Sequence, residues 1–277
     1  MKNILAITIF LFLAIQPLQA EDKPRYISLA PSTTEILFAL GLDNEIVGVS
    51  SYCNYPEKAK AKESIGDFSN PNIEKIVSLR PDCIFCTGLE QAPVVDKLKK
   101  LNLNVYVSDP KNTKELFETI LDIGKLTNRE YTAQILVKKI ELELEETSDK
   151  VGLIALDQRK KVFIEIWHDP LTTAGQGSFI DEIITFSGGI NIAKDTKRPY
   201  SIFSTEEVIR RDPDCIILAY MGQDKSVKAL EQRFGWNNIK AVKNKRVFSD
   251  IDQNIILRPG PRIGKAAKEI YERIYQR

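Results

Sequence analysis

The sequence predicts an α/β protein made of two similar lobes, each with a mainly parallel sheet flanked by helices, and one long helix that bridges the lobes. Three observations predict this fold class. One segment occurs twice, strand and helix patterns alternate within each half, and a helical stretch without glycine or proline separates the halves. The 277 residues suffice for two domains of ordinary size.

The repeated segment occupies residues 68–84 and 200–216. Its two copies share six identities over seventeen residues and read aromatic-Ser-x4-Glu-x6-Pro-Asp-Cys-Ile, with no gap. Each copy places a glutamate six residues after an aromatic residue. Two similar lobes leave a cleft between them, and a ligand is expected there.

The first twenty residues are expected to be a cleaved signal peptide. Lys2 is their only charge, residues 4–15 form an apolar run of twelve, and Ala20 is a small residue at the expected cut. A membrane span needs about 20 apolar residues, so this run is too short. The first cysteine is Cys53, and no cysteine follows the run to accept a lipid. We expect a soluble periplasmic protein without a lipid anchor.

The charge balance of the mature chain argues against nucleic-acid binding. Without Lys2, the 39 basic residues become 38, equal to the 38 acidic residues. Nucleic acids and anionic membrane surfaces both require a positive field, which a neutral chain lacks.

The N-terminal lobe, residues 21–127, alternates apolar strands with helices. Ser32 is expected to cap the first helix and Gly41 to end it. The expected strands are 26–30, 46–49, 82–86 and 105–107, and the expected helices are 33–40, 73–79 and 94–101.

The bridging helix is expected at residues 128–150 and would extend roughly 30 Å. Its expected apolar side is Tyr131, Ile135, Ile140, Leu142 and Leu144. The C-terminal lobe, residues 151–277, starts with an expected strand at 162–167 and an expected helix at 179–187, which Gly188 ends.

Ligands of parallel sheets lie at the carboxyl ends of the strands, so residues that follow strands are the candidates for binding. In the N-terminal lobe these are Tyr52, Phe68, Thr87 and Asp109, and in the C-terminal lobe Trp167, Tyr200, Tyr220 and Asp250.

The four cysteines are expected to be structural. Cys83 and Cys86 form a C-x-x-C pattern inside a strand, where residues three apart face opposite sides, and Cys215 takes the position of Cys83 in the second repeat. These positions favour buried thiols over a redox or zinc role. A disulfide from Cys53 to Cys83 or Cys86 stays open as an alternative.

Enzyme signatures are weak. Gly175-Gln176-Gly177-Ser178 follows a strand, but the third glycine of a dinucleotide motif is Ile180, which indicates a turn with a capping serine. His168 is the only histidine, which excludes a histidine-based metal site. We expect no catalytic residues, no metal and no cofactor. A two-lobed metal- or nucleotide-dependent enzyme is the alternative from a different class.

Several segments resemble the helical-backbone, class III substrate-binding proteins of ABC importers, with corrinoid receptors the most similar. They are residues 24–41, 47–52, 55–56, 72–77 and 187–192, and the likeness covers essentially the whole mature chain. The resemblance implies two α/β lobes, a bridging helix and a monomer that captures a cobalamin-like corrinoid. Ferric siderophore and haem receptors share most of these motifs and form the alternative.

The resemblance also implies roles for individual residues. The ligand contacts would be Tyr52, Phe68, Trp167, Tyr200 and Asp250. Glu74 and Glu206 would each form an acidic knob, one on each lobe, that docks on arginines of a membrane permease served by ATPase subunits. Taken singly, each glutamate fits an ordinary acid in the first turn of a helix.

Overall fold

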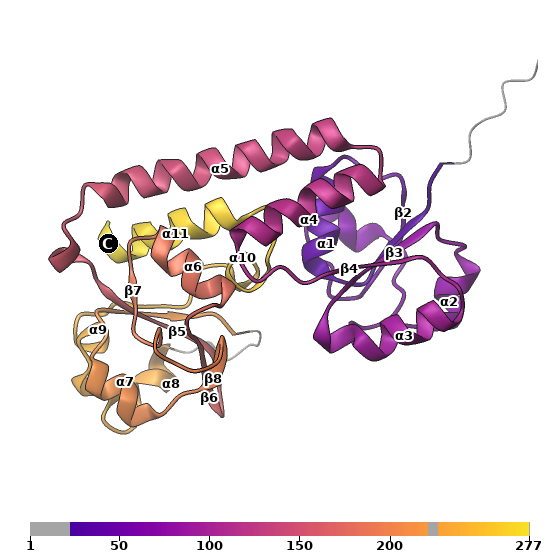
Figure 1. The fold of residues 1–277 in the computed structure, drawn as a ribbon. Helices are drawn as coiled ribbons and strands as arrows, with labels where there is room; N and C mark the ends of the chain where they lie inside the picture. The colour runs from indigo at the N-terminus through magenta and orange to yellow at the C-terminus, as the bar shows by residue number, and fades with distance from the viewer. Residues whose placement is uncertain (1–22, 221–226, 277) are drawn as a thin grey trace, which may run out of the picture.

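The computed structural model describes residues 23–220 and 227–276 and shows two α/β lobes that share one long helix, α5 (Figure 1). The expected signal peptide, residues 1–20, lies outside the described residues. None of the described helices is long and apolar enough to span a membrane. The fold class predicted from the sequence is confirmed.

The N-terminal lobe has one four-stranded sheet in the order β2-β1-β3-β4, with every neighbouring pair parallel. Its elements are β1 (Tyr26–Ser28), α1 (Pro31–Ala39), β2 (Ile46–Val49), η1 (Glu57–Ala61), α2 (Ile73–Ser78), β3 (Cys83–Thr87), η2 (Leu89–Gln91), α3 (Ala92–Lys100), β4 (Val105–Ser108) and α4 (Thr113–Leu126). Helix α4 was not among the expected helices; Asn112 caps it by accepting a hydrogen bond from the Glu115 backbone N–H.

The C-terminal lobe has a mixed sheet in the order β10-β9-β5-β6-β8, with β7 also paired to β5. Its elements are η3 (Leu156–Gln158), β5 (Lys161–His168), β6 (Leu171–Ala174), α6 (Phe179–Phe186), β7 (Ile190–Asn191), β8 (Tyr200–Ile202), α7 (Thr205–Arg211), β9 (Cys215–Leu218), α8 (Val227–Glu231), η4 (Trp236–Asn238), α9 (Lys240–Lys243), β10 (Val247–Phe248), α10 (Gln253–Leu257) and α11 (Ile263–Tyr275). Strands β7, β9 and β10 belong to its parallel part, whereas β6 runs antiparallel to both β5 and β8.

The two copies of the repeat adopt the same local structure. In each copy a polar side chain caps a short helix: Asn72 accepts from the Lys75 N–H before α2, and Ser204 accepts from the Glu207 N–H before α7. Each helix leads into a buried strand that begins at Cys83 or Cys215. A strand, a helix and a glycine with positive φ, Gly41 in one lobe and Gly188 in the other, also recur near the start of each lobe.

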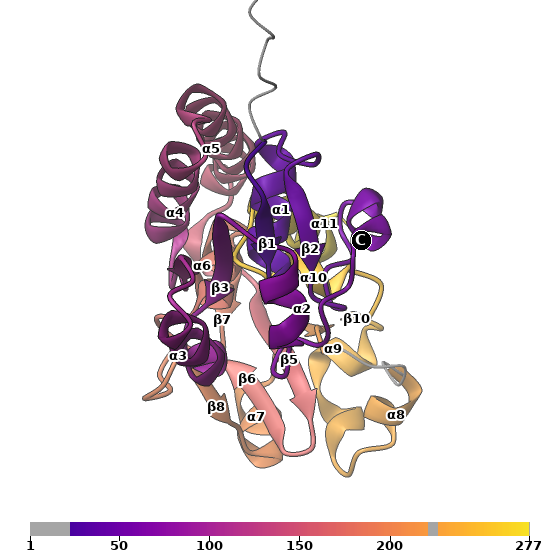
Figure 2. The same ribbon diagram turned by 90° about the vertical axis from the view of Figure 1, so that its right-hand side faces the viewer.

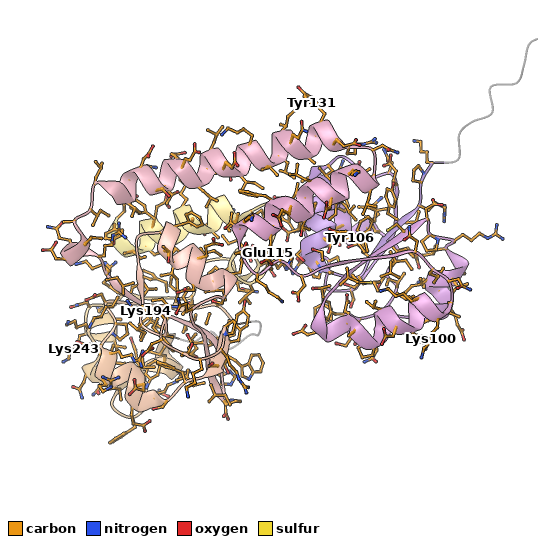
Figure 3. The ribbon with its side chains drawn as sticks, in the orientation of Figure 1. Lys100, Tyr106, Glu115, Tyr131, Lys194 and Lys243 are labelled. Carbon is orange, nitrogen blue, oxygen red and sulfur yellow. The ribbon has the colours of Figure 1, made fainter. Side chains whose placement is uncertain are left out.

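The bridging helix α5 (Glu130–Gly152) packs along α4 of the N-terminal lobe and α11 of the C-terminal lobe, and Figure 2 shows α4 beside it. Ile140 and Leu144 are buried against these helices, as expected. The expectation that Tyr131, Ile135 and Leu142 share this apolar side is wrong, because all three are exposed. Position 131 lies nine residues before Ile140, which is two and a half helical turns and therefore the opposite face. Tyr131 accordingly points outward (Figure 3).

The predicted start of the first helix also needs correction. Helix α1 begins at Pro31, and its N-cap is Ala30, which makes no side-chain capping bond; Ser32 already lies inside the helix. Proline fits the first helical position because its fixed φ is helical and its missing N–H would have no partner there.

Four cysteines are buried and free in the part of the chain that the structure describes. Cys83 packs in the cluster beneath α1 and α4, whereas Cys86 packs in the cluster around α3 on the other face of the sheet. This division follows the strand geometry that the spacing predicted, and the alternative of a disulfide to Cys53 is not formed. Burial raises the pKa of the Cys83 thiol to about 11 and that of Cys86 to about 12.

Candidate functional site

A cavity of about 940 Å³ lies between the lobes, near the upper end of the range for ligand pockets, about 300–1,000 Å³. Both lobes line it, and its walls come mostly from loops at strand ends. Its lining residues include Pro31, Tyr52, Phe68, Thr87, Glu90, Asp109 and Lys111 from the N-terminal lobe, and Phe179, Arg198, Tyr200, Leu257 and Arg258 from the C-terminal lobe.

The N-terminal wall is made by residues at the carboxyl ends of parallel strands. Tyr52 follows β2 and is half exposed, Thr87 ends β3, and Asp109 follows β4. Asp109 packs directly over Gly88, where an added Cβ would come within 2.4 Å of its carboxylate. Gly88 therefore allows the carboxylate to lie at this edge of the cavity.

Phe68 is held at the cavity by a buried glutamine. The Gln91 side chain donates hydrogen bonds to the Phe68 carbonyl at 2.8 Å and to the Leu29 carbonyl at 3.2 Å, and it accepts one from the Thr87 N–H at 2.9 Å. Gln91 has no accessible surface. One amide thus ties the Phe68 loop to the ends of β1 and β3, which holds the backbone of Phe68 at the cavity wall.

The C-terminal wall centres on Tyr200, at the start of β8. Burial raises the pKa of the Tyr200 phenol, and the negative charge of Asp109 from the opposite lobe raises it further. Tyr200 therefore stays neutral at physiological pH and presents a ring and a hydroxyl to the cavity. The adjacent loop packs on Gly175, because a Cβ there would lie 1.7 Å from the Thr196 hydroxyl.

Charges differ between the two walls. The N-terminal wall carries Asp67, Glu90 and the ion pair of Asp109 with Lys111. The C-terminal wall carries two guanidinium groups, Arg198 and Arg258. The cavity is thus acidic on one side and basic on the other, an arrangement that orients a ligand with both hydrogen-bond donors and anionic groups.

The structure brings three of the five expected ligand contacts to the cavity, namely Tyr52, Phe68 and Tyr200. Trp167 and Asp250 are not among the lining residues. The Trp167 indole N–H donates to the Asp169 carbonyl at 2.8 Å, and its ring lies 5.5 Å from that of His168. Asp250 forms an ion pair with Arg273 of α11 at 2.9 Å.

Two residues of the basic wall were missed by the sequence analysis. Arg198 precedes Pro199 and Tyr200 in the loop before β8, and Arg258 lies in a turn with two prolines and a glycine. The Pro-Tyr sequence next to Arg198 was a usable signal, because it adjoins a predicted contact. Arg258 had no such signal, since its ionic partner is 223 residues away in the chain.

The expected docking residues lie on the surface. Glu74 and Glu206 are exposed in the first turns of α2 and α7, on the side of each lobe away from α5 (Figure 1). The Ser204 hydroxyl donates to the Glu206 carboxylate at 2.6 Å and lowers the pKa of that carboxyl group, which keeps it charged at neutral pH.

A metal-binding cluster of three or more histidine, cysteine, aspartate or glutamate side chains is absent from the described residues. No histidine or cysteine is among the residues that line the described cavity. The chemistry offered at the cavity is therefore aromatic contact, hydrogen bonding and ion pairing.

Comparisons with known proteins agree with this geometry. A family model described as "Periplasmic binding protein" matches residues 27–253. The chain is 33% identical over 260 residues to the Bacillus subtilis "Uncharacterized ABC transporter substrate-binding lipoprotein YvrC", covering 92% of this chain and 81% of that protein. It is 30% identical over 213 residues to a "Vitamin B12-binding protein" of Yersinia pseudotuberculosis, covering 76% of this chain and 75% of that protein.

A crystal structure from Staphylococcus epidermidis, described as a possible iron-binding periplasmic solute-binding protein, has the same fold. It superposes with a TM-score of 0.79 at 32% identity, over 91% of this chain and 98% of that one. The region that the family model matches, residues 27–253, includes both sheets, the bridging helix and all the residues that line the cavity except Asn254, Leu257, Arg258 and Pro259. The chain therefore belongs to the periplasmic binding protein family, the class III substrate-binding proteins.

Proposed function

We propose that this protein is the substrate-binding component of an ABC importer and captures a cobalamin-like corrinoid in the cavity between its lobes. The observation that carries the proposal is the cavity itself, about 940 Å³ in volume, with Tyr52 and Phe68 on one wall and Tyr200 on the other. Aromatic rings give a large contact area at a small cost in side-chain entropy, which suits a broad, flat macrocycle.

The two charged walls suit a corrinoid as well. The side-chain amides of a corrin ring can donate to Asp67 and Glu90 on the N-terminal wall. The phosphodiester of the nucleotide loop can bind Arg198, since guanidinium groups match phosphate oxygens. The Yersinia relative named for vitamin B12 supports the same ligand class.

A ferric siderophore or haem is the second candidate ligand. The Staphylococcus structure described as possibly iron-binding favours it, and so do the phenol oxygens of Tyr52 and Tyr200 at the cavity. The raised pKa of Tyr200 weighs against it, because an iron-ligating phenol must lose its proton. Binding, with no catalytic step, is proposed for either ligand.

Delivery to the importer is proposed to use Glu74 and Glu206. Both residues are exposed on equivalent helices of the two lobes, and these helices, α2 and α7, lie on the side of the lobes away from α5 (Figure 1). A pair of separated acidic groups on one face is suited to meet arginines on a two-fold symmetric permease. The protein is proposed to dock as a monomer.

Titration of the purified protein with cyanocobalamin, haemin and a ferric trihydroxamate tests the ligand. We expect the tightest binding for cyanocobalamin. Tyr200→Ala and Phe68→Ala should each weaken it by on the order of 1–3 kcal/mol, or about 5–150-fold. Tyr131→Ala is the matched control, because this exposed tyrosine lies on the outer face of α5. Unchanged affinity in both cleft variants would refute the proposed binding surface, and a preference for haemin or the trihydroxamate would replace the corrinoid.

A further inference from the structure

Two arginines of the C-terminal lobe hold the turn of the N-terminal lobe that carries Tyr52. Arg258 donates from Nη2 to the Tyr52 carbonyl at 3.3 Å and from Nη1 to the Asn54 side-chain oxygen at 2.8 Å. The guanidinium of Arg262 lies over the Tyr55 ring, 3.9 Å from its centroid. The contacts therefore cross from one lobe to the other along residues 52–55.

Glu35 of α1 holds both arginines through ion pairs. Its carboxylate accepts from Arg258 Nη1 at 3.1 Å, from Arg262 Nε at 2.7 Å and from Arg262 Nη2 at 2.7 Å. The side chains are 2% exposed for Glu35, 10% for Arg258 and 12% for Arg262, so water competes little for these bonds. Asp252 pairs with Arg262 at 3.2 Å and makes the group of four charges neutral.

The turn is also tied to its own lobe. The Cys53 N–H donates to the Ser50 carbonyl at 3.0 Å, and the Ser51 N–H donates to the Gly66 carbonyl at 2.9 Å. These bonds hold the residues on either side of Tyr52, and the bond from Arg258 holds the carbonyl of Tyr52 itself. The backbone from which the Tyr52 side chain projects is therefore held in part by a side chain from the other lobe.

We propose that Arg258 is a positioning residue for Tyr52, so that the C-terminal lobe sets an aromatic surface of the N-terminal wall. Phe68 differs, because Gln91 of its own lobe holds it. A lysine could not replace Arg258, since a single ammonium group cannot reach the three acceptors that the planar guanidinium meets. The effect on ligand affinity rests on the proposed function, whereas the effect on the Tyr52 ring rests on these contacts alone.

Fluorine NMR of ligand-free protein labelled with 3-fluorotyrosine tests the positioning directly. The chain has nine tyrosines, and Tyr52→Phe assigns the resonance of interest. We expect Arg258→Gln and Arg258→Lys to shift and broaden the Tyr52 resonance. Arg273→Gln, which breaks an ion pair with Asp250 outside the cavity, should leave it unchanged. An unchanged Tyr52 resonance in Arg258→Gln would overturn the proposal.

Asn54→Ala is a second test of the positioning, for use if Arg258→Gln does not fold. Asn54 is exposed and does not line the cavity, and its loss leaves the Glu35 ion pairs in place. It should move the Tyr52 resonance in the same direction as Arg258→Gln, by a smaller amount. No movement would count against the proposal.

A double-mutant cycle with cyanocobalamin separates positioning from direct contact, since Arg258 also lines the cavity. Arg258→Gln should weaken binding by on the order of tenfold in the natural sequence, but by less than about twofold when Tyr52→Ala is already present. An equal loss in both backgrounds would show that Arg258 acts on the ligand and would overturn the inference. If the natural protein binds no cyanocobalamin, the corrinoid proposal fails, and the fluorine experiment still decides the role of Arg258.

Discussion

Removal of the Glu35 carboxylate should destabilise the protein strongly. Glu35→Ala leaves two guanidinium groups whose side chains are 10% and 12% exposed. Of the acidic groups in this cluster, Asp252 then remains to balance them. The variant also loses three charge-assisted hydrogen bonds. Breaking a buried ion pair by removing one partner costs about 3–5 kcal/mol. We expect a loss in the free energy of unfolding in this range.

Urea unfolding at pH 7, followed by far-UV circular dichroism and by tryptophan fluorescence, measures the loss. With an m value of about 3 kcal/mol/M, the midpoint should fall by about 1–1.7 M. Glu146→Ala is the matched control, because it removes a carboxylate that is 60% exposed and pairs with Lys150 on the surface of α5. The control should change stability by less than about 0.5 kcal/mol.

An apolar replacement sharpens the test. Glu35→Leu combined with Arg258→Met and Arg262→Met should recover much of the stability, because the three buried charges are then gone and the carboxylate that loses its ion pair, Asp252, is 43% exposed. A loss below about 1 kcal/mol in Glu35→Ala would refute the reasoning, since it would mean that water or another acid satisfies both arginines.

Four further outcomes are expected. Replacement of both Glu74 and Glu206 by lysine should leave cyanocobalamin affinity intact and abolish uptake through the cognate importer, and either single replacement should reduce uptake less. Normal uptake in the double variant would rule out docking through these residues. X-ray scattering should give nearly the same radius of gyration with and without ligand, because α5 packs on both lobes; a domain-scale contraction would contradict this. The four thiols should react with a disulfide reagent at pH 8 only after unfolding, and fast reaction of the folded protein would contradict their burial. Burial raises the pKa values of Cys86 and Cys215 from 9.0 to about 12, so the folded state keeps protons that the unfolded state loses, and the free energy of unfolding should fall as pH rises from about 9 toward 12. Mass spectrometry of protein exported by its host should give a mature chain that begins at Glu21 without a lipid; another start or an added acyl mass would contradict the predicted cleavage.

The N-terminal lobe was predictable because its sheet is wholly parallel. The rule that ligands lie at the carboxyl ends of parallel strands pointed to Tyr52, Phe68, Thr87 and Asp109, and all four line the cavity. The repeat and the alternation of strands and helices likewise pointed to two lobes, because both patterns can be recognised without knowing any tertiary contact.

The C-terminal wall was harder to predict because its sheet is mixed. The antiparallel strands β6 and β8 bring Tyr200 to the cavity from the start of a strand. Trp167 lies within β5, where it pairs with antiparallel β6, and Asp250 follows β10; both are outside the lining. The apolar face of α5 was misassigned for a related reason. Ile135 and Leu142 are apolar but exposed, so the sequence does not distinguish them from residues of the buried face. That face is identified by the packing of α5 against α4 and α11.

The junction of Glu35 with Arg258 and Arg262 also bears on how the chain is made. Glu35 belongs to α1, the first helix of the described residues, and Arg262 follows it by 227 residues. An N-terminal lobe that emerges first therefore folds around a carboxylate whose partners do not yet exist, and it reaches full stability only when the last helix arrives. A chain that stops short of Arg258 lacks the ion pairs that join Glu35 to the C-terminal lobe, so we expect it to open more often and to be cleaved faster by proteases. The C-terminal arginines thus make completion of synthesis a condition for a durable fold.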